Sequence, residues 1–180
     1  MRWPLFNHPD TPTYYNGRIC MLGDAAHASS PSQAAGAGQG LEDAQLLSHL
    51  FGLVQGPQQI QTAIEIYDAI RRPRAQSVVQ ESRIVGDIYY LGYPGYGDDM
   101  QKITDEANVR LPAIWWYDLE KDVKKAEAMF TEKCGAAGIL GSAKPLSEKK
   151  VKVIEPAVVE KPAEKKQKRS KKFSKFCTIL

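Results

Sequence analysis

A run of residues near the beginning of the chain limits its fold more than any other feature. An apolar segment at 18–22 ends in Gly23 and Asp24, small residues follow, and three glycines stand at alternate positions between 36 and 40. Apolar residues then recur at helical spacing over 41–54. This order predicts a buried strand, a tight turn or helical turn over 24–30, a glycine turn and an amphipathic helix, and therefore a mixed α/β fold.

The rest of the chain is predicted to be mainly helical. Residues 1–16 are expected to form an extended lead-in. A long helix is predicted from 58 to about 91, because Pro57 suits a first helical turn and an apolar stripe follows it. Pro73 is expected to kink this helix, since proline removes a backbone donor and crowds the preceding turn. The remaining predicted elements are a loop at 92–97, a short helix at 98–108 and a charged helix at 118–133 with Leu119, Val123, Ala126 and Phe130 facing inward.

Charge is divided unevenly between the body of the chain and its C-terminal end. Residues 161–180 contain eight Lys or Arg and one Glu, whereas the preceding residues carry 20 acidic and 16 basic side chains. An acidic body with a basic tail predicts an anionic partner for the tail. The three cysteines lack metal-ligand spacing, and the sequence shows no signal peptide, membrane-spanning run or nucleic-acid motif. These features favour a reduced, cytoplasmic compartment and no nucleic-acid partner.

The string at 23–44 resembles the second flavin-binding motif of the FAD-dependent aromatic hydroxylases, the salicylate-hydroxylase-like flavoprotein monooxygenases. In that family the motif lies in the second half of the enzyme. The resemblance covers about residues 2–133 and implies the C-terminal part of an FAD-binding domain with a Rossmann-like α/β fold, mostly helical over this stretch. The predicted division is this domain at 1–143, followed by a disordered linker and polybasic tail at 144–180.

The resemblance implies that a set of small and polar residues contacts FAD. The predicted cofactor-binding residues are Gly23, Asp24, Ala26, Pro31, Gly36, Ala37, Gly38 and Gln39. The Asp24 carboxylate can accept hydrogen bonds from ribityl hydroxyls, while Gly23 and Ala26 leave room for the ribityl–pyrophosphate chain. The N-terminus of the following helix, with unpaired N–H groups and partial positive charge, is expected to face the negatively charged edge of a reduced flavin.

Several neighbouring residues are expected to be structural, and no catalytic residue or metal site is predicted. Glu42 and Asp43 are placed in the first turn of the helix, where acidic side chains favour the helix dipole. His27 is expected to pack or to form a hydrogen bond rather than to transfer protons. Three arginines of the long helix are expected to bind carboxylates or carbonyls; they are Arg71, Arg72 and Arg74.

The chain also departs from the family pattern. Ser32 stands where relatives often have His, and Ala34 where Gly is common. There is no G-x-G-x-x-G turn, which in the family binds the ADP pyrophosphate. The chain is therefore expected to be part of an enzyme that reduces FAD with NAD(P)H and hydroxylates a small aromatic substrate with O2, and to bind FAD poorly alone. The alternative is a non-enzymatic, membrane-tethered module that keeps part of the flavin fold as a scaffold. An exposed sheet edge in such a partial fold predicts self-association.

The last four residues, Cys177, Thr178, Ile179 and Leu180, match a C-a-a-X box, and the final Leu favours a geranylgeranyl group on Cys177. The basic run before them would supply the second signal that stable anchoring to an anionic membrane surface needs. Prenylation predicts a location at a cytoplasmic membrane face. The alternatives are a disordered basic tail that ends in cysteine by chance and a run resembling a nuclear-localisation signal.

Overall fold

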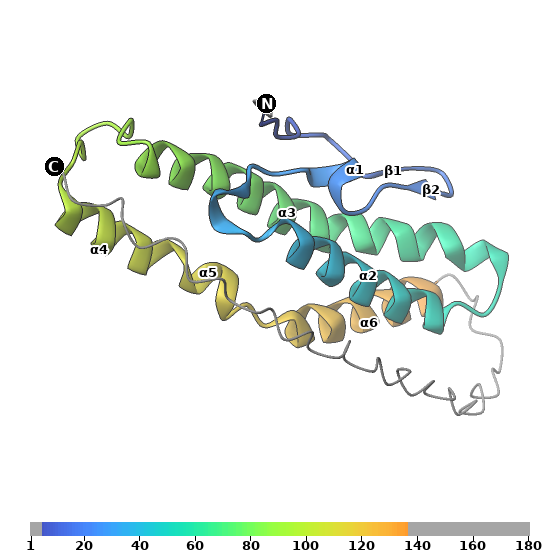
Figure 1. Cartoon of the computed structure of the whole chain (residues 1–180). Helices are drawn as coiled ribbons and strands as arrows, with labels where there is room; N and C mark the ends of the chain where they lie inside the picture. The colour runs from blue at the N-terminus through green and yellow to red at the C-terminus, as the bar shows by residue number, and fades with distance from the viewer. Residues whose placement is uncertain (1–4, 137–180) are drawn as a thin grey trace, which may run out of the picture. The chain divides into compact units, whose positions relative to one another are not determined.

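The computed structural model describes residues 5–136, and the chain is mainly helical over this range (Figure 1). The elements in chain order are β1 (Tyr15–Asn16), β2 (Ile19–Cys20), α1 (Asp24–His27), the 3-10 turn η1 (Pro31–Gln33), α2 (Gly36–Leu53), the 3-10 turn η2 (Pro57–Gln59), α3 (Ile60–Tyr89), α4 (Met100–Arg110), α5 (Pro112–Trp115) and α6 (Leu119–Ala136). The predicted tail at 144–180, including Cys177, lies outside the described residues. None of the helices within 5–136 is long and apolar enough to cross a membrane.

The predicted buried strand at 18–22 is wrong in both its length and its surroundings. Strand β2 covers only Ile19–Cys20 and pairs antiparallel with β1, with Tyr15 opposite Cys20 and Asn16 opposite Ile19. Gly17 makes the turn between them with a φ of 58°, a conformation that glycine adopts without steric cost. Ile19 is 75% exposed. The apolar run therefore forms one side of a short hairpin, and the α/β class rests on this hairpin alone within the described range.

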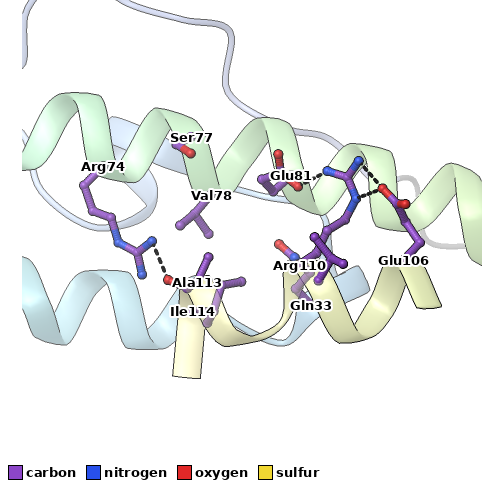
Figure 2. Close-up of a pocket in the computed structure, with 10 residues that line it drawn as sticks. Gln33, Arg74, Ser77, Val78, Glu81, Glu106, Arg110, Ala113 and Ile114 are labelled. Atoms are coloured by element: carbon purple, nitrogen blue, oxygen red, sulfur yellow. Dashed lines mark hydrogen bonds and ion pairs between the residues drawn. The ribbon is translucent and has the colours of Figure 1, made fainter. Parts of the chain in front are cut away.

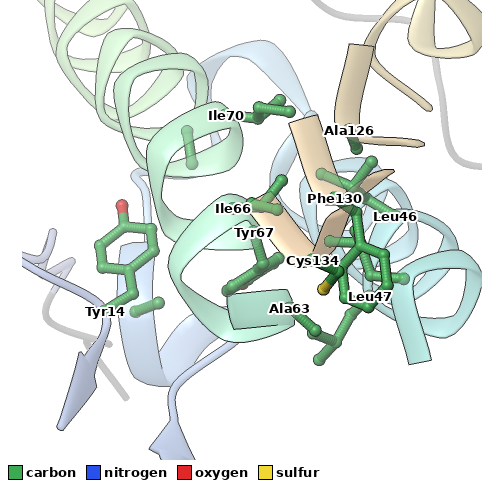
Figure 3. Packing of buried hydrophobic residues seen from close by; sticks show 13 residues of the cluster. Tyr14, Leu46, Leu47, Ala63, Ile66, Tyr67, Ile70, Ala126, Phe130 and Cys134 are labelled. Atoms are coloured by element: carbon green, nitrogen blue, oxygen red, sulfur yellow. The ribbon is translucent and has the colours of Figure 1, made fainter. Parts of the chain in front are cut away.

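The hydrophobic core lies where α2, α3 and α6 pack together (Figure 3). Its buried members include Leu46, Leu47 and Leu50 from α2, Ala63, Ile66, Tyr67 and Ile70 from α3, and Ala126, Phe130 and Cys134 from α6. The spacing of three and four residues on each helix places these side chains on one face. Burial of a single side chain such as Leu50 stabilises the fold by about 1.5–3 kcal/mol. The predicted inward positions Ala126 and Phe130 are confirmed as buried.

Helix α2 begins five residues earlier than the apolar periodicity predicted. It starts at Gly36, so the three glycines at 36–40 lie inside the helix and do not form the expected glycine turn. The turn is made instead by Ala34, whose φ of 52° lies in the left-handed region. This backbone conformation is the physical reason why glycine suits position 34, and alanine there costs about 1–2 kcal/mol. The predicted end of the helix near Val54 is confirmed.

Helix α3 is the long helix that the sequence predicted. It covers Ile60–Tyr89, follows a turn that begins with Pro57, and continues through Pro73 without a break (Figure 1). Two of the three later helices, α4 and α6, begin at side-chain caps. The Asp99 carboxylate accepts a hydrogen bond from the backbone N–H of Lys102 ahead of α4, and Asp118 accepts one from Lys121 ahead of α6.

Candidate functional site

The segment from Gly23 to His27 leaves one carboxylate free on the surface. Gly23 has a φ of 57°, and its carbonyl accepts hydrogen bonds from the N–H groups of Ala26 (2.9 Å) and His27 (3.0 Å). Ala26 is 1% exposed, so its methyl group faces the interior. Asp24 is exposed, and its carboxylate has no hydrogen-bond partner among residues 5–136. The turn therefore exposes the Asp24 side chain and buries that of Ala26.

The N-terminus of α2 lies beside this turn and carries no side-chain cap. Ala35 occupies the cap position, and no side chain accepts from the first N–H groups of the helix. The N–H groups of the first turn have no partner within a helix, and they give this end a partial positive charge. Ala37 and Gly38 are exposed, and a Cβ added at Gly38 would meet no atom within 4 Å. A Cβ at Gly40 would lie 3.7 Å from the Gly23 Cα, which places the turn and the helix side by side.

Behind the surface, the buried Asp43 carboxylate ties the turn to the long helix. One of its oxygens accepts from the Gly23 N–H (2.9 Å) and contacts His27 Nε2 (2.5 Å). The other oxygen accepts from Arg71 Nε (2.8 Å). Burial alone would raise the pKa of Asp43, but the hydrogen bonds from His27, Gly23 and Arg71 outweigh it and hold the pKa below its usual value. Asp43 is therefore the fixed anion that holds Gly23 in place.

Arg71 completes this cluster from α3. Its side chain is fully buried and donates to Glu42 Oε2 (2.5 Å), as well as to the backbone carbonyl (3.3 Å) and side-chain oxygen (2.9 Å) of Gln39. Burial opposes the charge of Arg71, yet the bonds to Asp43 and Glu42 raise its pKa above the usual value. The predicted structural role of Arg71 is confirmed. We call Arg71, Asp43, Glu42 and His27 the charged cluster.

The cluster corrects two predictions. Because α2 starts at Gly36, Glu42 and Asp43 lie beyond its first turn, where the helix dipole has little effect, and they pair with Arg71 instead. Gln39 is also placed differently from the prediction. It is 2% exposed, its side chain bonds to Arg71 and Glu42, and its N–H donates to the carbonyl of Ala35. The structure therefore turns Gln39 inward, away from the surface that Asp24 shares with α2.

The other predicted site residues occupy the connection between the turn and the helix. Pro31 is exposed and opens η1, and its carbonyl accepts from the N–H of Ala34 (3.0 Å). Gly36, the first residue of α2, is partly buried beside Ser29. The structure thus brings Gly23, Asp24, Gly36, Ala37 and Gly38 to one end of α2.

Sequence reasoning did not find the role of Asp43, although a signal was present. Arg71 follows Tyr67 by one helical turn and Ile64 by two, so it stands on the apolar stripe of α3. A charged residue on a buried stripe needs a buried partner of opposite charge. Tyr67 and Asp68 of α3 also hold the chain before Gly23: the Tyr67 hydroxyl donates to the Met21 carbonyl (3.1 Å), and Asp68 accepts from the Tyr14 N–H (2.7 Å).

Comparison with known proteins identifies flavoproteins that this chain resembles. The family described as FAD binding domain matches residues 7–82. An FAD-dependent monooxygenase of Gibberella moniliformis is 44% identical over 135 residues, which are 70% of this chain and 31% of that protein. A salicylate hydroxylase of Pseudomonas putida is 40% identical over 139 residues, 77% of this chain and 32% of that protein.

A solved structure described as a salicylate hydroxylase substrate complex superposes with a TM-score of 0.62 and 42% identity, and covers 65% of this chain and 29% of that one. The chain thus spans about a third of the length of the curated relatives it matches. The chain is similar to part of the FAD-dependent monooxygenases related to salicylate hydroxylase, and its residues 7–82 match the FAD binding domain family.

Proposed function

We propose that this chain supplies the ribityl- and phosphate-contacting segment of the FAD site in a monooxygenase that hydroxylates a small aromatic substrate. The observation that carries the proposal is the pairing of a free, exposed Asp24 carboxylate with the uncapped N-terminus of α2. The relative and the solved structure named salicylate hydroxylase support an aromatic substrate, and the resemblance to this family implies NAD(P)H as the co-substrate.

The chemistry of FAD fits these residues. Its ribityl chain offers hydroxyl donors to a carboxylate such as Asp24, and its phosphates and reduced ring offer negative charge to the N–H groups of Gly36, Ala37 and Gly38. The missing side chain at Gly38 leaves open space where a ligand can approach the backbone. When bound, FAD supplies the redox chemistry with NAD(P)H and O2.

This chain's own residues keep the site in shape. Asp43 holds the Gly23 N–H, and the Gly23 carbonyl holds the start of α1, so the direction of Asp24 depends on the charged cluster. The positive charge of Arg71 is neutralised by its ion pairs with Glu42 and Asp43. The positive element near Asp24 is therefore the N-terminus of α2. The cluster therefore acts as a positioning device below the surface that the cofactor would contact.

The test is complementation. The full chain is mixed with the N-terminal part of the Pseudomonas putida salicylate hydroxylase, and retained FAD is measured by its visible absorbance after gel filtration. We expect a flavin-containing complex that oxidises NAD(P)H faster when salicylate is present. Asp24→Asn should weaken FAD binding about tenfold or more, because a hydrogen bond to a charged group is lost.

The matched control is Asp87→Asn, which changes an exposed carboxylate on α3 far along the chain. It should leave FAD binding unchanged. Equal affinity in the Asp24 and Asp87 variants, or a mixture that retains no flavin, would contradict the proposal. The scaffold alternative predicts that no mixture retains FAD.

The C-terminal tail supports a separate proposal on location. Cys177 and the basic run before it would anchor the chain to an anionic, cytoplasmic membrane face through prenylation. Fractionation of cells that express the chain should move Cys177→Ser from the membrane pellet to the supernatant. A variant that stays in the pellet as fully as the parent chain would rule out lipidation as the anchor.

A further inference from the structure

A cavity of about 280 Å³ lies between the second half of α3 and the helices α4 and α5 (Figure 2). Its apolar wall is formed by Val78 from α3, Val109 from α4, and Ala113 and Ile114 from α5. This volume is near the lower end of the range for small-molecule sites, roughly 300–1,000 Å³. The cavity is separate from the Asp24 surface, and its polar groups decide what it can hold.

At one end of the cavity, the charge of Arg110 is fully engaged. Its Nε donates to Glu106 (2.7 Å), and its Nη1 donates to Glu81, as Figure 2 shows. Tyr96 also donates its hydroxyl to Glu106 (2.8 Å). Two carboxylates thus face one guanidinium, and this end has no surplus positive charge for an anionic ligand.

At the other end, Arg74 is bonded only in part. Its Nη1 donates to the carbonyl of Ala113 (3.0 Å), and the guanidinium stacks 3.9 Å from the centre of the Tyr117 ring. Its Nε lies 3.6 Å from Glu42, beyond hydrogen-bond distance. The buried Nη2 has no hydrogen-bond partner within the described part of the chain. Arg74 therefore has a spare donor, while Glu42 already opposes its charge.

Gln33 offers a second spare donor. The residue is only 7% exposed, and its Oε1 accepts from the Ser82 hydroxyl (3.1 Å). Its buried Nε2 finds no hydrogen-bond partner among residues 5–136, and Gln33 lines the cavity. A buried donor without an acceptor is costly, so an acceptor atom brought by a ligand would be favoured.

We propose that this cavity binds a small uncharged molecule with an apolar ring or chain and an amide or ketone oxygen. That oxygen accepts from Gln33 Nε2, and the apolar part packs on Val78 and Ile114. Glu81 and Glu106 pair with Arg110, and Glu42 is shared between Arg71 and Arg74, so the charges around the cavity are already balanced and a carboxylate ligand gains nothing from its charge.

Because of the position of Gln33, a ligand in the cavity would also affect η1 and the turn before α2. Gln33 ends η1, directly before Ala34 and the start of α2. The turn packs closely on α3, because a Cβ at Gly86 would come within 2.8 Å of the Ser32 hydroxyl oxygen. An occupied cavity is therefore expected to order η1 and the following turn. The inference does not rest on the proposed flavin site, since none of the groups it uses lies on the Asp24 surface.

Two probes of similar size separate charge from shape. Benzamide carries an NH2 group where benzoate carries a second carboxylate oxygen, so the two are close in size and differ in charge. Each is titrated into the ¹⁵N-labelled full chain while NMR signals are followed. We expect benzamide to shift the side-chain NH2 signals of Gln33 and the backbone signals of α5 with a roughly millimolar dissociation constant, as befits so small a ligand. Benzoate should bind at least about tenfold more weakly.

Two variants test the location. Ser77→Phe fills the cavity from an exposed position of α3 and should abolish the shifts, whereas Ala69→Phe, also exposed on α3 but outside the cavity, should keep them. Gln33→Met removes the donor at similar length and should weaken benzamide binding about tenfold. Absent shifts with both probes, equal binding of benzoate, or unchanged binding in Ser77→Phe would each overturn the proposal.

Discussion

The core between α2, α3 and α6 and the charged cluster around Asp43 are both buried, but different forces hold them. In the core, Leu50, Phe130 and their neighbours exclude water from apolar surface, a contribution that is roughly additive and not directional. In the cluster, each group depends on the charge and the position of its partners. The core can lose a methyl group and adapt, whereas the cluster cannot lose one charge without leaving another unpaired.

The two regions share helices, which makes the comparison informative. Asp43 precedes Leu46 and Leu47 by one turn of α2, and Arg71 follows Tyr67 by one turn of α3. The same pair of helices therefore changes from apolar to ionic contact over a few residues. The ionic part lies at the end of α2 that faces Gly23 and Asp24, where exact placement of a backbone N–H matters more than stability.

The largest effect is expected from Asp43→Ala. It leaves Arg71 buried with one carboxylate fewer and removes the acceptor of both the Gly23 N–H and His27. Breaking a buried ion pair in this way costs about 3–5 kcal/mol. Urea unfolding followed by circular dichroism should show the loss. A loss below about 1 kcal/mol would mean that the cluster is as weak as a surface ion pair.

Leu50→Ala tests the other side of the comparison. Leu50 is fully buried, and its truncation should cost about 2–5 kcal/mol, depending on how far the core relaxes. The distinguishing result is local. In Leu50→Ala, the Gly23 amide should exchange its hydrogen as slowly, relative to global unfolding, as in the parent chain. In Asp43→Ala, the same amide loses its acceptor and should exchange faster. Equal exposure in both variants would show that the two regions open as one unit.

The free energy of unfolding below about pH 4 should respond differently to changes in the charged cluster and in the core. The pKa of Asp43 is lower in the folded chain than in the unfolded chain, so its contribution is complete above the unfolded-state value of about 4. The contribution is then lost as the pH falls through the folded-state pKa. Asp43→Asn should flatten this acidic part of the curve of stability against pH, and Leu50→Ala should shift the whole curve without changing its slope. A slope unchanged by Asp43→Asn would contradict the low pKa.

The parts of the fold that the sequence predicted well depend on local signals. The ends of α3 and α6 follow from the apolar stripe, from Pro57 and from Asp118, all of which act within a few residues. The hairpin had a local signal too, because a glycine at the first position of a two-residue turn, here Gly17 before Arg18, favours a hairpin, but the apolar run beside it suggested burial. Its true environment depends on what packs against it, which residues 18–22 alone do not contain.

The candidate site was predictable for residues that act through their backbone or exposed side chains, and less so for buried ones. Gly23 and Asp24 follow from the family motif, and the structure places them at the end of α2. Gln39 belongs to the same motif but turns inward, because Arg71, 32 positions later, draws its side chain away. Pairings over such distances depend on how α2 and α3 pack, which local spacing does not specify.

The smallest effect expected is a gain, from Ala34→Gly. Ala34 adopts a φ of 52°, where a Cβ meets the neighbouring backbone, and glycine removes that strain at the cost of a more flexible unfolded chain. The balance should stabilise the fold by about 0.5–1 kcal/mol, measured by urea unfolding. The turn connects η1 to α2, so this variant relieves strain outside both regions, without touching Asp43 or Leu50. If Ala34→Gly destabilises the chain, the turn is not left-handed in solution, and the start of α2 at Gly36 must be revised with it.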